Sequence, residues 1–354
     1  MPGQLTTRLM LEAAYFSGGT SLTNHKLRGL GSILMLHRVA RAEPGAFAPN
    51  AHLSVDPVFL EEVLAYLSGS IFKFASMDEA VSMVRSAAEG EKPVRPFVAV
   101  TLDDGYRDNL ENAVPLFRKY RVPYTIYVAP GLVDGRATLW WEDLERLIAA
   151  RQTLYFDWNG TRREFPLATP REKQEAFAAL LHYLTHEVSE HEQRRIVGGM
   201  CALHGIDCDA HRAGSIMNWA ELRELAKDPL CTLGAHTIGH YALARLPEKE
   251  AIGELEQSRD LIALETGRRP DHFAYPYGYP AAAGEREFAL AARCGFASAV
   301  TTRHGVVYPE HAGHSTALPR ISLNGNFQKL RYLRTMLSGV TTRLANKGRK
   351  LNLD

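Results

Sequence analysis

The sequence predicts an α/β fold, a distorted (β/α) barrel of about seven parallel strands with a helical insertion at about residues 136–213. Two observations lead to this prediction. Short apolar runs rich in β-branched residues alternate with longer segments of helical periodicity, which is the pattern of β/α units around a parallel sheet. Several of these runs end directly in polar side chains, as strands do when their carboxyl ends carry a site.

The elements follow in chain order. Pro57 after Asp56 marks the start of one helix, because proline suits the first helical position. The segment 136–213 has two tryptophans, several histidines and helical periodicity near 171–203, so we expect an insertion rather than a separate domain. The strands are expected at 32–38, 72–74, 97–102, 124–129, 231–235, 272–275, 297–301 and 318–323, and the other helices at 78–88, 109–120, 219–227 and 248–266.

Composition is that of a soluble globular enzyme, with 45% hydrophobic and 23% charged residues in 354. A formal charge of +1 predicts no general affinity for nucleic acid. Four cysteines without C-x-x-C spacing predict neither a zinc framework nor disulfides, and no secretory or membrane-spanning run is found. We therefore expect a cytoplasmic protein with an N-terminal extension (1–30), a catalytic domain (31–325) and a basic C-terminal helix or tail (326–354).

The strand predicted at 97–102 ends in Asp103, Asp104 and Gly105. Two adjacent carboxylates repel each other and lose solvation on burial, unless a cation compensates. A divalent metal would allow one carboxylate to bind the ion while the other serves as a base. The alternative is a plain turn, because Asp-Gly is a strong turn signal.

A second group of polar residues, His236 to His240, follows the strand predicted at 231–235. Two imidazoles four residues apart fall on one face of a helical turn and can share a metal ion. Together with Asp104 they make a ligand set that is familiar from hydrolytic zinc sites. The alternative is a capped helix start with exposed histidines.

These residues resemble the motifs of the polysaccharide deacetylases, the nodulation-deacetylase homology domain of carbohydrate esterase family four. Thr101 to Gly105 resembles the first motif, His236 to His240 the second and Phe273 to Gly278 a variant of the third. The resemblance covers about residues 30–325 and implies a distorted barrel of roughly seven parallel strands. It also implies that Asp103 is the general base, that Asp104, His236 and His240 bind a divalent metal, most simply zinc, and that the Tyr277 backbone N–H helps hold the oxyanion in a turn shaped by Pro276.

Two positions depart from the family pattern. The third motif often begins with an arginine that orients the base, and here Ala274 stands in its place. Arg107 and Arg320 are the candidate replacements, and Arg320 is preferred because it lies in a late strand. No clear match exists for the histidine that acts as general acid. His314 is the first candidate, with His304 and His311 behind it, because an ordinary imidazole pKa of about 6.5 suits proton donation to a leaving amine.

The resemblance implies a metal-dependent hydrolase that removes N-acetyl groups from amino-sugar units of a glycan, of the chitooligosaccharide type. Trp140, Trp141 and Tyr279 are candidate platforms for sugar rings, with buried packing as the alternative for at least one tryptophan. Three other classes are alternatives. The first is a metal-free glycoside hydrolase, the second is a metal-dependent phosphoesterase, or an amidohydrolase or esterase on another acylated substrate, and the third is a catalytically impaired carbohydrate-binding protein. Adjacent carboxylates do not easily flank a glycosidic bond, which needs them about 5–10 Å apart.

The C-terminal segment 327–354 contains seven Lys or Arg and one acid. Leu330, Leu333, Met336, Leu337, Val340 and Leu344 recur at helical spacing, so the segment is expected to be an amphipathic helix with a basic face. Such a helix can lie on an anionic membrane, here the inner face. The alternative is a terminal helix packed on the barrel with a basic tail.

Overall fold

Seven parallel strands close into a barrel in the computed structural model, which describes residues 4–17, 20, 24–41, 47–91 and 93–353. The barrel closes where β1 pairs with β5 from Gly31 opposite Phe97 to Leu36 opposite Leu102. This closed sheet confirms the predicted fold class. Around the barrel the strands are β1 (Gly31–Leu36), β12 (Leu318–Ser322), β11 (Ser298–His304), β10 (His272–Ala274), β9 (Cys231–Ala235), β6 (Tyr124–Val128) and β5 (Phe97–Leu102).

The strands are apolar because both of their faces are covered. All residues of β1, β5 and β6 are buried, as expected for parallel strands with side chains filling the barrel on one face and helices covering the other. Gly31 allows the closest approach, since a Cβ atom there would lie 2.3 Å from the carbonyl oxygen of Phe97. Outside the closed barrel, β4 (Lys73–Phe74) adds to the start of β5, and β2 (Arg38–Val39) pairs with β3 (Ser54–Val55).

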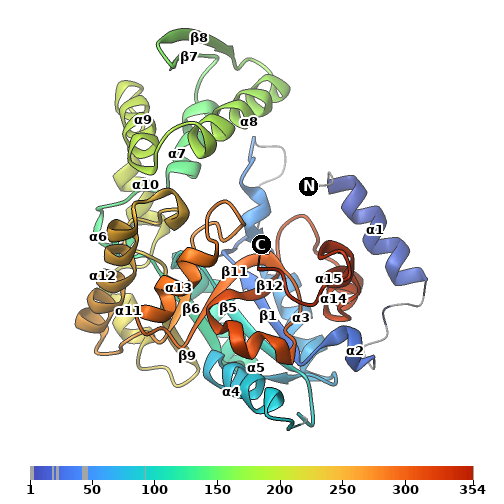
Figure 1. Ribbon diagram of the computed structural model, residues 1–354. Helices are drawn as coiled ribbons and strands as arrows, with labels where there is room; N and C mark the ends of the chain where they lie inside the picture. The colour runs from blue at the N-terminus through green and yellow to red at the C-terminus, as the bar shows by residue number, and fades with distance from the viewer. Residues whose placement is uncertain (1–3, 18–19, 21–23, 42–46, 92, 354) are drawn as a thin grey trace.

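Helices surround the barrel near the predicted positions (Figure 1). Asp56 caps the first of them with Pro57 as its first residue, and Ser76 and Glu79 form a capping box at the next. They are α3 (Pro57–Ser68), α4 (Met77–Ala88), α5 (Val114–Tyr120), preceded by a π-helical turn at Asn109–Ala113, α6 (Pro130–Asp134), α11 (Trp219–Leu225), α12 (Glu248–Thr266) and α13 (Glu285–Arg293). Short 3-10 turns lie at Ala51–Leu53, Leu243–Arg245 and Pro309–Ala317.

The insertion rises from the barrel as a lobe at the top of Figure 1. It contains α7 (Trp140–Ala149), α8 (Pro170–His186), α9 (Glu190–Leu203) and α10 (Cys208–Ser215). It also contains a hairpin of β7 (Thr153–Trp158) and β8 (Thr161–Pro166), which the helical prediction missed. Asn159 and Gly160, both with positive φ, form its two-residue turn, and Asn-Gly is a recognised hairpin signal.

The two chain ends pack together on one side of the barrel. Glu12 in α1 (Gln4–Phe16) accepts hydrogen bonds from Arg331 and Tyr332 in α14 (Leu330–Leu337), and α2 (His25–Arg28) contacts α15 (Val340–Ala345). The single C-terminal helix expected from the sequence is instead two short helices, divided at Gly339, where φ is 78°. The apolar side chains of α14 are buried against the protein: Tyr332, Leu333, Met336 and Leu337. None of the helices in the described ranges is long and apolar enough to cross a membrane.

Candidate metal and catalytic centre

Asp103 and Asp104 stand in a tight turn at the carboxyl end of β5. The turn is tied to β1, because the Asp103 N–H donates to the carbonyl oxygen of Leu36 at 2.9 Å. Asp104 and Gly105 both have positive φ, 72° and 75°. A left-handed conformation is costly for a residue other than glycine, and such strain is typical of functional sites. Both aspartates are 1% exposed, so the turn holds two carboxylates inside the protein.

Asp104 meets the two histidines that follow β9. Its Oδ1 lies 3.3 Å from Nε2 of His236 and 3.1 Å from Nε2 of His240. The three candidate ligand atoms lie within 4.8 Å of one another, and all three side chains are buried. Nδ1 of His236 lies 2.7 Å from the carbonyl oxygen of Ala274, which orients the ring with Nε2 toward Asp104. One carboxylate and two imidazoles therefore converge on a single point.

The loop that carries His236 and His240 is not the helical turn expected from their spacing. Thr237 and His240 have positive φ, 59° and 54°, which a right-handed helix does not allow. Glu254 of α12 holds the loop instead, accepting hydrogen bonds from the N–H groups of Ile238 at 2.7 Å and Gly239 at 2.8 Å. The sequence predicted a helix at 248–266 but gave no sign that Glu254 would hold this loop. The irregular loop still brings both Nε2 atoms to Asp104.

Asp103 is held by Arg320 of β12, which is separated from β5 by β1 alone. The guanidinium donates to both carboxylate oxygens at 2.7 Å, in the bidentate geometry that arginine favours. Two further bonds fix Arg320 itself, to the carbonyl oxygen of Thr301 at 2.8 Å and to Oγ1 of Thr101 at 3.1 Å. The other candidate, Arg107, binds Glu221 and backbone carbonyls near the end of the insertion. Of the two candidate arginines, Arg320 is thus the one that contacts Asp103.

Burial and charge set the ionisation of the centre. Burial alone would raise the pKa of Asp103, but the adjacent Arg320 outweighs it and leaves the pKa below its usual value. Burial lowers the pKa of His240 to about 4, so this imidazole is neutral near pH 7, as a metal ligand must be. For His236 burial acts in the same direction, but the nearby Asp104 and Asp103 reverse it and raise the pKa. A bound cation would oppose protonation of both rings, so we take the neutral form as the ligand state.

The polysaccharide deacetylase family model matches residues 90–155 and 168–297, together more than half of the chain. The chain belongs to the polysaccharide deacetylase family. No curated protein sequence matches it. Asp103, Asp104, His236 and His240 all lie inside the matched residues, whereas β1 and β12, with Arg320, lie outside them.

Solved structures share the fold of this deacetylase. The Streptococcus pyogenes deacetylase PplD in complex with acetate matches with a TM-score of 0.57 and 18% identity, over 86% of this chain and 97% of that one. IcaB from Ammonifex degensii matches with a TM-score of 0.53 and 18% identity, over 87% and 98% of the two chains. The putative polysaccharide deacetylase BA0330 from Bacillus anthracis matches with a TM-score of 0.54 and 15% identity, over 86% and 68%.

Aromatic side chains from the insertion pack beside the candidate metal ligands. The Trp141 ring lies 4.8 Å from that of His240, and Nε1 of Trp140 donates to the Tyr277 hydroxyl at 2.8 Å. The tryptophans are only 1% and 7% exposed, so the packing alternative applies to both and neither offers a face to a sugar ring. Tyr277, with φ of 62°, stands in the turn after β10, and Tyr279 beside it is half-buried.

The three histidines considered as general acid lie away from this centre. His314 is exposed and precedes the amino end of β12, whereas the aspartates stand at the carboxyl end of β5. His304 contacts Thr341, and His311 contacts the backbone of Tyr308. The expectation for His314 therefore fails on geometry, since in a parallel barrel the two ends of the strands are on opposite sides.

A histidine that sequence reasoning did not select lies at the centre instead. His37 directly follows β1, and its Nε2 is 3.8 Å from Oδ2 of Asp103. Its side chain is 21% exposed, so it can reach both the carboxylate and solvent. The signal was available, because His37 ends an apolar strand in the same way as Asp103 and His236 do.

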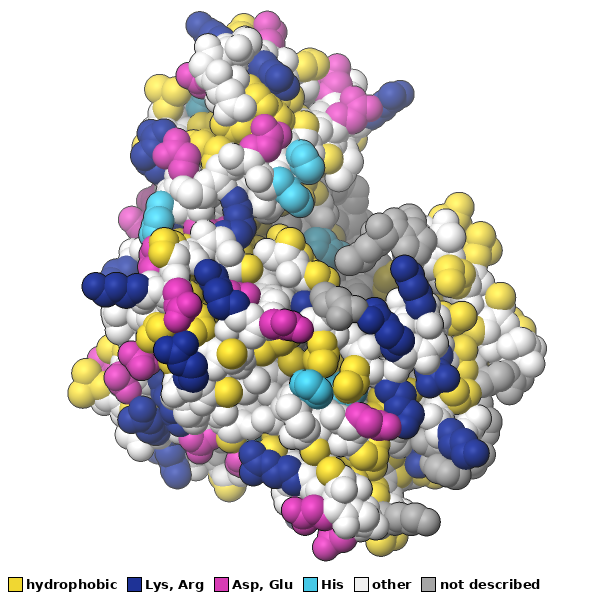
Figure 2. Space-filling model, in the orientation of Figure 1, with side chains coloured by type: hydrophobic (Ala, Val, Ile, Leu, Met, Phe, Trp, Pro, Cys, Tyr) yellow, Lys and Arg dark blue, Asp and Glu magenta, His cyan; other side chains and the backbone are white. Residues whose placement is uncertain are grey.

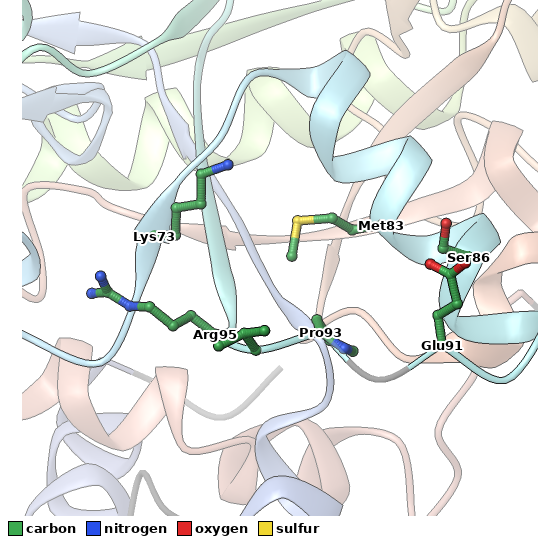
Figure 3. Close-up of a pocket in the computed structure, with 7 residues that line it drawn as sticks. Lys73, Met83, Ser86, Glu91, Pro93 and Arg95 are labelled. Atoms are coloured by element: carbon green, nitrogen blue, oxygen red, sulfur yellow. The ribbon is translucent and has the colours of Figure 1, made fainter.

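A separate cavity lies at the other end of the barrel (Figure 3). Its volume is about 320 Å³. Lys73 begins β4 and Arg95 precedes β5, so the cavity borders the amino ends of these strands. It therefore does not coincide with the aspartates and histidines at the carboxyl ends.

Proposed function

We propose that this member of the polysaccharide deacetylase family is a metal-dependent hydrolase that removes N-acetyl groups from amino-sugar units of an oligo- or polysaccharide, of the N-acetylglucosamine type. One observation carries the proposal: a buried carboxylate held by an arginine stands directly beside a buried cluster of one carboxylate and two imidazoles. Such a pair provides a base and a cation site within reach of one acyl group.

The donor set fits a divalent ion. Asp104 Oδ1 is buried and has no hydrogen-bond partner among the described residues, and burying a carboxylate oxygen without one is costly. Neutral imidazole nitrogens with one carboxylate are a common ligand set of catalytic zinc, which is why zinc is our choice. An ion held by Asp104, His236 and His240 would polarise the acyl carbonyl and make a water molecule more acidic.

Asp103 is the general base of the proposed reaction. Its carboxylate takes one proton from the attacking water, while the water oxygen bonds to the acetyl carbon. Arg320 keeps the carboxylate ionised and fixes the direction of both oxygens, so that the base needs no reorientation during the reaction. Cleavage of the carbon–nitrogen bond then gives acetate and a free amino sugar.

His37 is the proton donor for the leaving nitrogen. The nitrogen must gain a proton as the bond breaks, and an imidazole is suited to supply it near neutral pH. His37 is partly exposed to solvent beside Asp103, and we assign it the role expected of His314. Because its Nε2 is 3.8 Å from Asp103, the proton taken from water can return to His37 for the next turnover.

Acetate release from chitooligosaccharides tests the proposal. We expect release by the purified chain, loss of release with a chelator, and recovery on addition of zinc. Asp103→Asn serves as the inactive control with the same shape. His37→Asn is expected to lower turnover while chitooligosaccharide binding stays. Binding of the sugar without release by the metal-loaded wild type would favour a carbohydrate-binding protein instead, and release only from O-acetylated sugars would favour an esterase.

The cytoplasmic location expected from the sequence stays a prediction. What supports it is that Cys201, Cys208, Cys231 and Cys294 are all free thiols. Fractionation of cells that produce the chain, followed by immunodetection, would test the location directly.

A further inference from the structure

The outward face of α1 exposes more large hydrophobic residues than any other helix in the described part of the chain. Eleven large hydrophobic residues are exposed among all the described residues, and four of them lie in α1. Leu5, Leu9 and Phe16 are 72%, 61% and 76% exposed, and Met10 is 46% exposed. Single exposed apolar residues are ordinary, but several on one face mark an interaction surface.

The apolar face is continuous and carries no charge. Helical spacing places Leu5, Leu9 and Phe16 in one row, because residues four and seven apart fall on the same side. Leu11 points the other way and is buried at 4% exposure. The two charged residues of α1 lie outside this row and bond to the protein: Arg8, which is exposed, donates to the carbonyl oxygen of Asn326 at 3.0 Å, and Glu12 accepts from Arg331. We call the exposed residues Leu5, Thr6, Leu9, Met10, Ala13 and Phe16 the α1 face.

The surroundings of the α1 face are strongly basic. Residues 1–30 and 326–354 together hold ten Lys or Arg against two acidic residues, although the whole chain has a formal charge of only +1. Lys329 and Lys347 are exposed, and Arg334 lies over the Tyr15 ring of α1. Figure 2 shows yellow side chains along α1 at the right-hand edge and dark-blue side chains over the C-terminal helices beside it.

We propose that the α1 face binds an anionic membrane surface. An apolar helix face bordered by basic residues is the arrangement with which a helix lies in the lipid interface, its apolar side in the acyl boundary and its cations near the headgroups. A second copy of the chain is the poorer occupant, because pairing two such faces would bring two basic clusters together. At 13 residues the helix is about 20 Å long, enough to lie along a membrane but not to cross one.

This surface differs from the one expected from the sequence. The sequence predicted that the apolar residues of the C-terminal segment enter the lipid, but Leu333, Met336 and Leu337 are buried against the protein. In the structure the C-terminal segment contributes charge and α1 contributes the apolar contact. Asn326, which Arg8 contacts, follows the carboxyl end of β12, so α1 begins at the end of the barrel that carries the deacetylase centre.

Vesicle co-sedimentation of the full chain tests the proposal. Wild type is expected to sediment with phosphatidylcholine vesicles that contain phosphatidylglycerol, and to be released at about 0.5 M salt, where charge attraction is screened. Leu9→Glu with Phe16→Glu should weaken this binding at least tenfold, and Lys329→Gln with Lys347→Gln should weaken it only for the anionic vesicles. The matched control is Leu203→Glu with Leu264→Glu, at residues 82% and 78% exposed on α9 and α12, which should bind as wild type does.

Two further measurements keep the result decisive. The melting temperature and acetate release from a soluble oligosaccharide should be the same in wild type and in the α1 variant, because the contacts that the structure gives for α1 are with α14 and Asn326. A failure of the membrane proposal can therefore be told apart from a failure of the proposed function. Equal sedimentation of wild type and the α1 variant would overturn it. So would a dimer of wild type in solution that the α1 variant no longer forms, since the face would then be a protein interface.

Discussion

Replacing Arg320 by methionine should destabilise the protein strongly, because Asp103 would remain as a buried charge. Asp103 and Arg320 are each 1% exposed, and the guanidinium supplies a hydrogen bond of 2.7 Å to each carboxylate oxygen. Two charge-assisted bonds at about 1.5–3 kcal/mol each give about 3–6 kcal/mol. Breaking a buried ion pair by removing one partner costs about 3–5 kcal/mol, which agrees with this range.

A double-mutant cycle separates the two origins of this cost. If the loss comes from the uncompensated carboxylate, Arg320→Met combined with Asp103→Asn should recover most of the stability that Arg320→Met loses. If it comes from lost packing, the double variant should be at least as unstable as the single one. Arg320→Lys keeps the charge but not the bidentate geometry, so its free energy of unfolding should lie between those of wild type and Arg320→Met.

Urea unfolding of wild type, Arg320→Met, Asp103→Asn and the double variant, followed by circular dichroism, gives the free energies for the cycle. Arg320→Lys is unfolded in the same way for comparison. Acetate release by Arg320→Lys, which we expect to fold, should fall about 10²-fold, because the base loses its fixed direction while its charge partner remains. An Arg320→Met variant that is within about 1 kcal/mol of wild type and fully active would refute the reasoning, because neither the carboxylate nor the reaction would then depend on the guanidinium.

Three other predictions follow from the structure. Asp103→Asn should bind zinc as wild type does, measured by metal analysis, while turnover falls by about 10²–10⁴-fold; loss of the metal would move Asp103 into the ligand set. Glu254→Gln should weaken zinc binding, because the loop that carries His236 and His240 loses the charged acceptor of two of its N–H groups. Competition with a chromogenic chelator measures the affinity, and an unchanged affinity would make Glu254 dispensable. His311 is 1% exposed, and its burial lowers its pKa to about 4 from 6.5, so stability present above pH 6.5 is lost as the pH falls toward 4. From pH 7 to 5 wild type should lose about 2 kcal/mol more than His311→Asn, as seen by urea unfolding at each pH, and equal losses would contradict this.

Much of the barrel could be predicted because strand signals are local. A strand buried on both faces needs a continuous apolar run, and β5, β6 and β9 were each placed to within a residue. The β7–β8 hairpin was missed for the opposite reason. Most of β8 is exposed and polar, so it has no apolar run, and only the Asn159-Gly160 turn marks it. Similarly, spacing alone could not show that His236 to His240 is an irregular loop, because Glu254, which holds it, comes from another element.

The candidate site shows where local reasoning ends. The aspartates and histidines at the ends of β5 and β9 could be found because each motif lies within a few residues of sequence. Arg320 meets Asp103 across 217 residues, and only the closure of the barrel between β1, β5 and β12 brings these strands together. The same closure also determines which of two histidines, His37 or His314, lies near Asp103. His37 follows the carboxyl end of β1 and therefore stands beside Asp103, whereas His314 precedes the amino end of β12 and lies on the opposite side. In a parallel barrel, the end of the strand at which a polar residue lies is thus a stronger guide to the function of that residue than its side-chain chemistry. An imidazole at the amino ends of the strands is too far from the centre at the carboxyl ends to donate its proton there.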